Sequence, residues 1–135
     1  MITLLSGFSD YYLVIARLII GAIFLAHGWP KLRNLPATWQ SFSMMGFKPG
    51  FFWGTIVAHV EFFGSLALIL GVGTQLIAIL LAVDIIVAAL WKMSRGQKLV
   101  GGYELDIAIL AALLIIVGIG GGVYALDNSW PVAIY

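Results

Sequence analysis

The chain has 135 residues, of which 62% are hydrophobic and only 10% are charged, and its formal net charge is +1. A soluble domain carries about 25% charged residues, so this composition is too apolar to cover a globular surface in water and predicts an integral membrane protein. The small net charge gives no basis for nucleic-acid binding, which depends on basic surfaces. Because the chain contains no cysteine, disulfides, thiolate metal sites and dithiol redox chemistry within it are excluded.

Four apolar stretches have the length of about 20 residues that a helix needs to cross a bilayer. They cover residues 11–29, 51–72, 75–91 and 103–123. The turn at 71–74 between the second and third stretches is so short that it predicts a tight hairpin between antiparallel helices. We therefore expect an all-α fold, an integral membrane four-helix bundle with antiparallel up-down topology, as a single transmembrane domain over residues 1–135.

Positive charge is concentrated in the two segments that join spans on one side of the expected bundle. The segments after the first and third spans contain the residues Lys31, Arg33, Lys48, Lys92, Arg95 and Lys98. The two chain tails and the turn at 71–74 contain no lysine or arginine. Since short cytoplasmic loops are enriched in these residues, we expect both basic loops in the cytoplasm and both termini outside.

The first basic loop contains the signals of a short helix. Asn34 is a suitable helix cap, and Pro36 falls in the first turn, where proline is tolerated. Trp39, Phe42 and Met45 then recur at helical spacing. Two interpretations stay open: an amphipathic helix on the inner membrane surface, or an ordered loop that packs its aromatic side chains on the bundle.

Ionisable side chains within the spans are the candidate functional residues. Each costs about 2.5–3.5 kcal/mol at the middle of a membrane, so it usually faces the protein interior and a partner. The candidates within or at the edge of the spans are Arg17, His27, His59, Glu61, Asp84, Glu104 and Asp106.

Depth along the helices, at about 1.5 Å per residue, divides these candidates into two groups. Glu61 and Asp84 fall near the midplane, where the long side chain of Arg17 can reach them. Its guanidinium group matches a carboxylate in geometry and charge, so Arg17 is expected to neutralise one of them. This central cluster is open to three interpretations. It is a buried ion-pair network that fixes helix packing, a polar lining for a substrate or quinone headgroup, or a proton path.

The second expected group lies near the inner boundary and contains His27, Glu104 and Asp106, with His59 between the two groups. Glu104 lies at the beginning of a helix, where a carboxylate favours the N-terminus, so a capping role is favoured for it. His27 is either a packed, hydrogen-bonded histidine or a ligand or proton-transfer contact. His27 and His59 lie on different helices without a known ligand spacing, so we expect no intrinsic metal or haem. No pairing of nucleophile and base identifies a catalytic residue.

Residues from about 15 to 128 resemble the DoxX family of small bacterial membrane proteins in order and spacing. In the first half, the matching residues are Arg17, Gly21, Phe24, His27, Gly28, Lys31 and Leu32, then Glu61, Gly64, Leu66, Leu68, Gly71 and Thr74. In the second half, they are Gly102, Tyr103, Glu104, Gly120, Gly122, Leu126 and Asp127. Gly121 stands where the family pattern has a proline, and Asp84 matches no position of that pattern.

The resemblance implies a multi-pass protein of the bacterial cytoplasmic (inner) membrane. It also implies links to thiosulfate:quinone oxidoreductases, to membrane redox complexes and, more remotely, to cargo receptors of the secretory pathway. We therefore expect the membrane subunit or anchor of a redox complex that contacts quinone through Arg17, His27, Glu61 and Glu104. Its expected partners are the lipid bilayer, the soluble proteins of that complex and further copies of the chain.

Two other functions stay open. One is an oligomeric transporter or carrier of a small solute, a lipid or protons, which the charged midplane favours. The other is a scaffold without chemistry. We do not expect the chain to be an enzyme by itself, and the cofactor, if one is bound, is expected to be a quinone.

Overall fold

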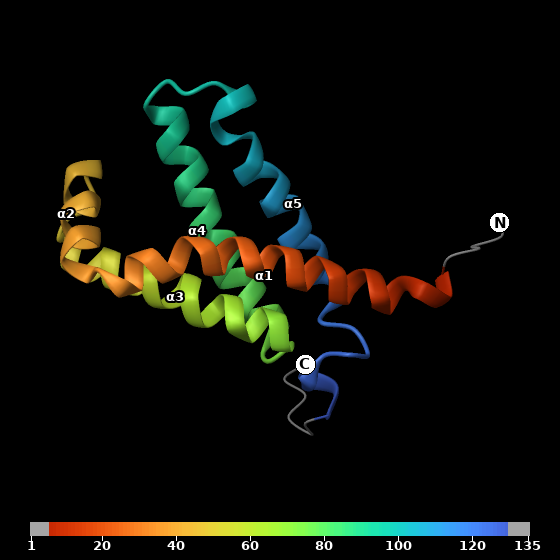
Figure 1. Cartoon of the computed structure of the whole chain (residues 1–135). Coiled ribbons are helices and arrows are strands. Elements are labelled where there is room, and N and C mark those ends of the chain that lie inside the picture. Colours follow the sequence, from red (N-terminus) through yellow and green to blue (C-terminus); the bar gives the residue numbers. More distant parts are fainter. Residues whose placement is uncertain (1–5, 130–135) are drawn as a thin grey trace.

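The structure, a computed structural model, describes residues 6–129. In this range the main helices are α1 (Ser9–Arg33), α2 (Leu35–Met45), α3 (Gly50–Leu70), α4 (Thr74–Ser94) and α5 (Glu104–Ile119) (Figure 1). Short helical turns cover Ser6–Phe8, Leu99–Tyr103 and Leu126–Ser129, and the described residues contain no strand. The predicted all-α fold is thereby confirmed.

Four helices are long and apolar enough to cross a membrane, as the sequence predicts. They are Ser9–Arg33, Gly50–Leu70, Thr74–Ser94 and Leu99–Ile119. The first of them continues past Trp29, the expected end of the span, so that Lys31 belongs to the last turn of α1. A residue that the sequence assigned to a loop is therefore held in place by a helix.

The predicted short helix in the first loop is α2. The Asn34 side chain accepts a hydrogen bond from the Ala37 N–H at 3.3 Å, and Gly46 ends the helix in the left-handed conformation with φ 97°, which glycine adopts without steric cost. Trp39 Nε1 donates to Thr55 Oγ1 of α3 at 2.8 Å. The helix thus packs on α3, and its position at a membrane surface stays a prediction.

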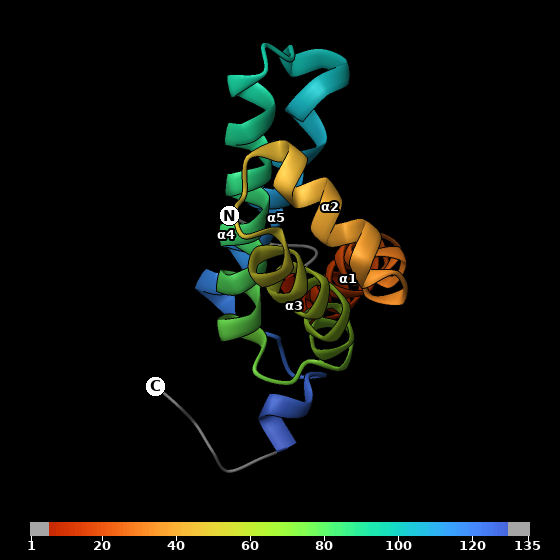
Figure 2. The same ribbon diagram turned by 90° about the vertical axis from the view of Figure 1, so that its left-hand side faces the viewer.

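The four long helices form two pairs that cross. Figures 1 and 2 show α1 beside α3 and α4 beside α5; in Figure 2 the first pair is seen close to end-on while the second pair runs up the picture. The crossing differs from the single bundle of four aligned helices that the sequence suggested. The up-down order of the spans across a bilayer stays a prediction.

The buried core lies where the two pairs meet. It contains Ile20 and Phe24 of α1, Leu68 of α3, Leu81 of α4 and Leu113 of α5. Many other large apolar side chains of these helices are exposed, as is expected of surfaces that face lipid. Because lipid is as apolar as leucine, contact between such helices depends on close packing and on polar interactions.

Small residues permit this close packing: Ala78 and Ala82 of α4, one turn apart, are both buried in the core. A Cβ atom on Gly28 would collide with the backbone of Glu61 and Phe62, so α1 and α3 approach closely there only because the residue is glycine. Gly118 and Gly122 have the spacing of a helix-contact pair but do not form one. Gly118 is exposed with open space around its Cβ position, and Gly122 follows the end of α5.

Candidate functional site

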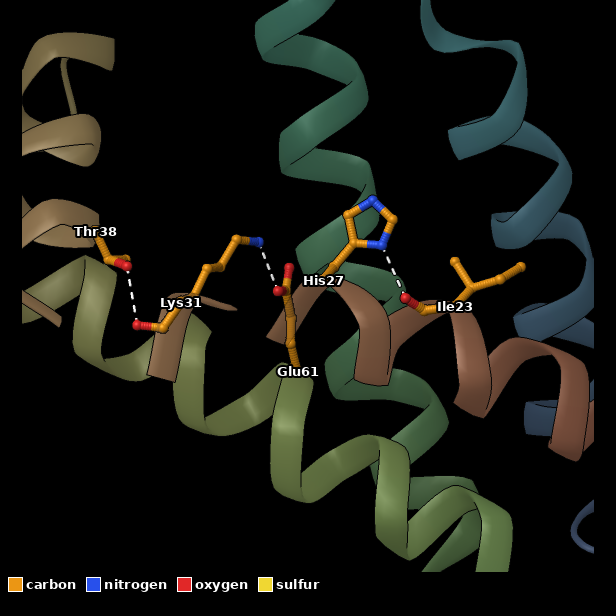
Figure 3. A network of polar contacts seen from close by, with 5 residues as sticks. All are labelled: Ile23, His27, Lys31, Thr38 and Glu61. Carbon is orange, nitrogen blue, oxygen red and sulfur yellow. Dashed lines mark hydrogen bonds and ion pairs between the residues drawn. The ribbon is translucent and has the colours of Figure 1, made fainter. Parts of the chain in front are cut away.

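An ion pair joins the last turn of α1 to the middle of α3. Lys31 Nζ lies 2.5 Å from Glu61 Oε2, and the Glu61 side chain is almost fully buried while that of Lys31 is 30% exposed. Figure 3 shows the Lys31 side chain directed at Glu61. Gly28 makes this pairing possible, because it lets α1 lie directly against the backbone at Glu61.

A second ion pair joins α4 to α5. Lys92 Nζ, in the last turn of α4, lies 2.7 Å from Asp106 Oδ2, in the first turn of α5. Asp106 is 5% exposed. Each helix pair therefore holds one lysine, at the end of a long helix, against one buried carboxyl group.

Asp84 lies near both ion pairs. It is half-buried in α4, close enough to Glu61, Lys31 and Asp106 for their charges to act on it. We call the five residues Lys31, Glu61, Asp84, Lys92 and Asp106 the charge cluster. With two lysines against three carboxyl groups, it has one acidic group more than its cations can neutralise.

The expected pairing of Arg17 with Glu61 and Asp84 is wrong. Arg17 Nη1 lies 3.5 Å from the carbonyl oxygens of both Leu68 and Ile69 at the end of α3. Its Nη2 donates to the Tyr124 carbonyl at 3.4 Å. The rotation of α1 about its axis and the positions of its neighbours direct the guanidinium to carbonyl groups at the far end of α3. Lysine, not arginine, neutralises the buried acids.

The expected group of His27, Glu104 and Asp106 is also not assembled. His27 is exposed, and its Nδ1 lies 2.8 Å from the Ile23 carbonyl of its own helix, turned away from Glu61 in Figure 3. Glu104 is exposed and accepts a hydrogen bond at 3.1 Å from the N–H of Gly101 in the turn before α5; a capping role for it stays a prediction. Only Asp106 enters the charge cluster.

His59 belongs to neither group and borders an apolar groove. Its Nδ1 lies 2.7 Å from the Thr55 carbonyl, and its ring stacks on Phe63 with 5.9 Å between ring centroids. The groove, between α3 and α4, has a volume of about 380 Å³ and is lined by His59, Val60, Phe63, Gly64, Ala67, Ile77, Leu80 and Leu81. His59 is the one polar side chain in this lining.

Sequence reasoning missed the two lysines and Asp127. Lys31 and Lys92 were counted as loop charges because the expected spans ended before them, although the spacing of Lys31 after Gly28 is part of the family pattern. Asp127 accepts the backbone N–H groups of Gly73 and Thr74 at 2.5 and 2.8 Å. Within residues 6–129, histidine and acidic side chains do not assemble in the groups of three that hold a metal ion.

Four long apolar helices joined by buried ion pairs define an integral membrane protein with charged groups inside its helical core. Residues 12–93 match the DoxX family profile, so the chain belongs to the DoxX family.

Three relatives match most of the chain. The Bacillus subtilis protein named "Putative oxidoreductase CatD" is 26% identical over 114 residues, covering 84% of this chain and 83% of the relative. The Escherichia coli "Inner membrane protein YqjF" is 27% identical over 122 residues, covering 89% and 92%. An uncharacterized protein of Haemophilus influenzae is 26% identical over 131 residues, covering 93% and 96%. No solved structure shows a significant match.

Proposed function

We propose that this DoxX-family protein is the membrane subunit of a redox complex in the bacterial cytoplasmic (inner) membrane. One relative has an oxidoreductase name, and another is named an inner membrane protein. The lysine and arginine residues of the two loops favour an orientation with those loops in the cytoplasm and both termini outside. Soluble partners would then dock on the side that carries the basic loops.

The apolar groove beside His59 is the observation that carries the redox proposal. Its volume of about 380 Å³ falls in the range of ligand pockets, which are mostly apolar with a few placed polar groups. A quinone headgroup fits these properties, because its ring needs apolar walls and its oxygens need a hydrogen-bonding partner. When bound, a quinone would supply two-electron redox chemistry.

His59 has the arrangement that such a ligand requires. Because the Thr55 carbonyl accepts a hydrogen bond from Nδ1, the neutral ring carries its hydrogen there and Nε2 is left as an acceptor. Nε2 would accept a hydrogen bond from a hydroxyl of the reduced headgroup, the quinol, and take its proton. Phe63 and Leu80, which line the groove, would keep water away from that exchange.

The direct test is to purify the full chain from its native membrane and to measure bound quinone by mass spectrometry of the extracted lipid. We expect quinone to co-purify with the wild type and to fall several-fold with His59→Ala. His27→Ala is the matched control, since His27 is an exposed histidine whose Nδ1 also bonds to its own helix, and it does not line the groove. Absence of quinone together with absence of any retained dehydrogenase would contradict the proposal.

The charge cluster favours a second function, the carriage of protons or small solutes by an oligomer. In the charge cluster, Glu61 and Asp106 are buried and the other three residues are half-buried, and charged groups inside membranes mark such pathways. In proteoliposomes, the double variant Glu61→Gln/Asp84→Asn should then abolish flux, and the exposed Glu104→Gln should leave it unchanged. Unchanged flux in the double variant would reject the cluster as the path.

The scaffold function has a different signature. The activity of the complex would then fall only in step with the abundance of this protein.

A further inference from the structure

The segment that follows α5 folds back over the turn between α3 and α4. The Asp127 N–H donates to the Gly71 carbonyl at 2.9 Å, and the Val123 N–H donates to Asp10 Oδ1 of α1 at 3.1 Å. In Figure 1 this segment, in blue, passes the lower ends of α3 and α4. It closes the end of the helices that lies opposite to the charge cluster, since Arg17 and Lys31 are separated by about 21 Å along α1 at 1.5 Å per residue.

Asp127 places a carboxylate at the beginning of α4. One of its oxygens accepts from the Gly73 N–H at 2.5 Å and the other from the Thr74 N–H at 2.8 Å. The first N–H groups of a helix have no partner within the helix and favour an anion. Gly73, the cap residue of α4, has no side chain to provide one, so the anion comes from a residue 54 positions away.

Two buried polar side chains near this carboxylate each have one polar atom without a hydrogen-bond partner among the described residues. Arg17 is 1% exposed and Thr74 is 0% exposed. Arg17 Nε and Thr74 Oγ1 have no hydrogen-bond partner within residues 6–129. Both residues act on Asp127, Arg17 through its charge and Thr74 at close range.

Arg17 also has no acidic group at ion-pair distance in the described residues, where the ion pairs are those of Lys31 with Glu61 and Lys92 with Asp106. Its bonds to carbonyl oxygens, at 3.4 to 3.5 Å, are long. Two backbone N–H groups therefore bind this carboxylate, and a guanidinium and a hydroxyl with unused hydrogen-bonding atoms lie near it. This is more donor capacity than a helix cap needs.

We propose that these groups form a binding site for a small carboxylate, and that Asp127 occupies the site as an internal ligand in this conformation. The two N–H groups, each bound to a different oxygen, select a planar carboxylate that binds through both oxygens. Arg17 supplies the positive charge that holds it. A carboxylate from outside binds when residues 120–129 move away from α4.

Chemical rescue tests the proposal. The melting temperature of the purified full chain in detergent is measured with sodium acetate or sodium formate, and with sodium chloride at equal ionic strength. Asp127→Ala lowers the melting temperature, and we expect acetate and formate to restore more than half of the loss in a saturable way, with no effect of chloride. The wild type shows no such response, because its own carboxylate fills the site.

Two controls separate a ligand site from an ordinary cap. Asp10→Ala removes another carboxylate that binds the same segment, through the Val123 N–H, and acetate should not restore its stability. Arg17→Gln in the Asp127→Ala background should abolish the rescue. If Asp127→Ala does not fold, Asp127→Ser takes its place, because its short side chain also leaves the position of the carboxylate empty. Equal responses to acetate and chloride, or rescue that persists without Arg17, would overturn the proposal.

Discussion

The ammonium group of Lys31 lies 2.5 Å from the Glu61 carboxylate and so fixes the end of α1 to the middle of α3. A charge buried among apolar helices is tolerated only with a partner of opposite charge. This single contact therefore accounts for the position of both residues. It also explains why the close approach of the two helices at Gly28 is needed.

Removal of either partner should destabilise the protein. We expect Lys31→Met to cost about 1.5–3 kcal/mol, the typical value for a hydrogen bond to a charged group, because Glu61 then stays buried without its cation. Lys31→Met/Glu61→Gln should cost less than the sum of the two single changes, since the stranded charge is gone. Denaturant unfolding in detergent measures these differences, with Lys98→Met, in an exposed loop, as the control. Additive losses would show that the two residues are not coupled.

Glycine at position 28 should be essential for the contact of α1 with α3. Gly28→Ala places a Cβ atom against the backbone of Glu61 and Phe62, and overpacking of this kind costs about 1–3 kcal/mol. Gly118→Ala is the matched control, because a Cβ there meets no atom within 4 Å. The melting temperatures of the two variants should differ clearly. A Gly28→Ala protein as stable as Gly118→Ala would contradict the close helix approach.

The stabilising effect of Asp127 should depend on pH. Partial burial raises the pKa of Asp127, but hydrogen bonds from Thr74 and Gly73 and the charge of Arg17 lower it by more, so the pKa lies below its ordinary value of 3.8. A lowered pKa in the folded state stabilises the protein above the unfolded-state pKa, and this contribution is lost as the pH falls through the folded-state pKa. The stability difference between the wild type and Asp127→Asn should therefore be constant near neutral pH and shrink below about pH 3.8. A difference that grows with acidity would show the opposite sign of the shift.

The expected orientation can be tested because the chain has no cysteine, so a single introduced thiol is the only one. Lys98 and Asn128 are both exposed and lie on opposite sides of the expected membrane. In intact cells without an outer membrane barrier, a membrane-impermeant maleimide should label Asn128→Cys and not Lys98→Cys. Permeabilised cells should show labelling of both. The reverse pattern in intact cells would place the basic loops outside.

The sequence alone predicted the four long helices and the short helix that begins after Asn34. These features depend on local properties, namely the length of apolar stretches, a capping side chain and a proline in the first turn. It also predicted that Glu61 and Asp106 would be buried, because a charge within an apolar stretch can avoid lipid only by facing other helices.

Only the tertiary structure decided which charges meet. Hydropathy places a residue at a depth, but the rotation of each helix about its axis and the crossing of the two helix pairs determine the direction of its side chain. For this reason Glu61 is paired with Lys31 and not with Arg17. Asp127 binds the beginning of α4 across 53 positions of sequence, a contact that no local pattern encodes because the folding back of the last segment creates it.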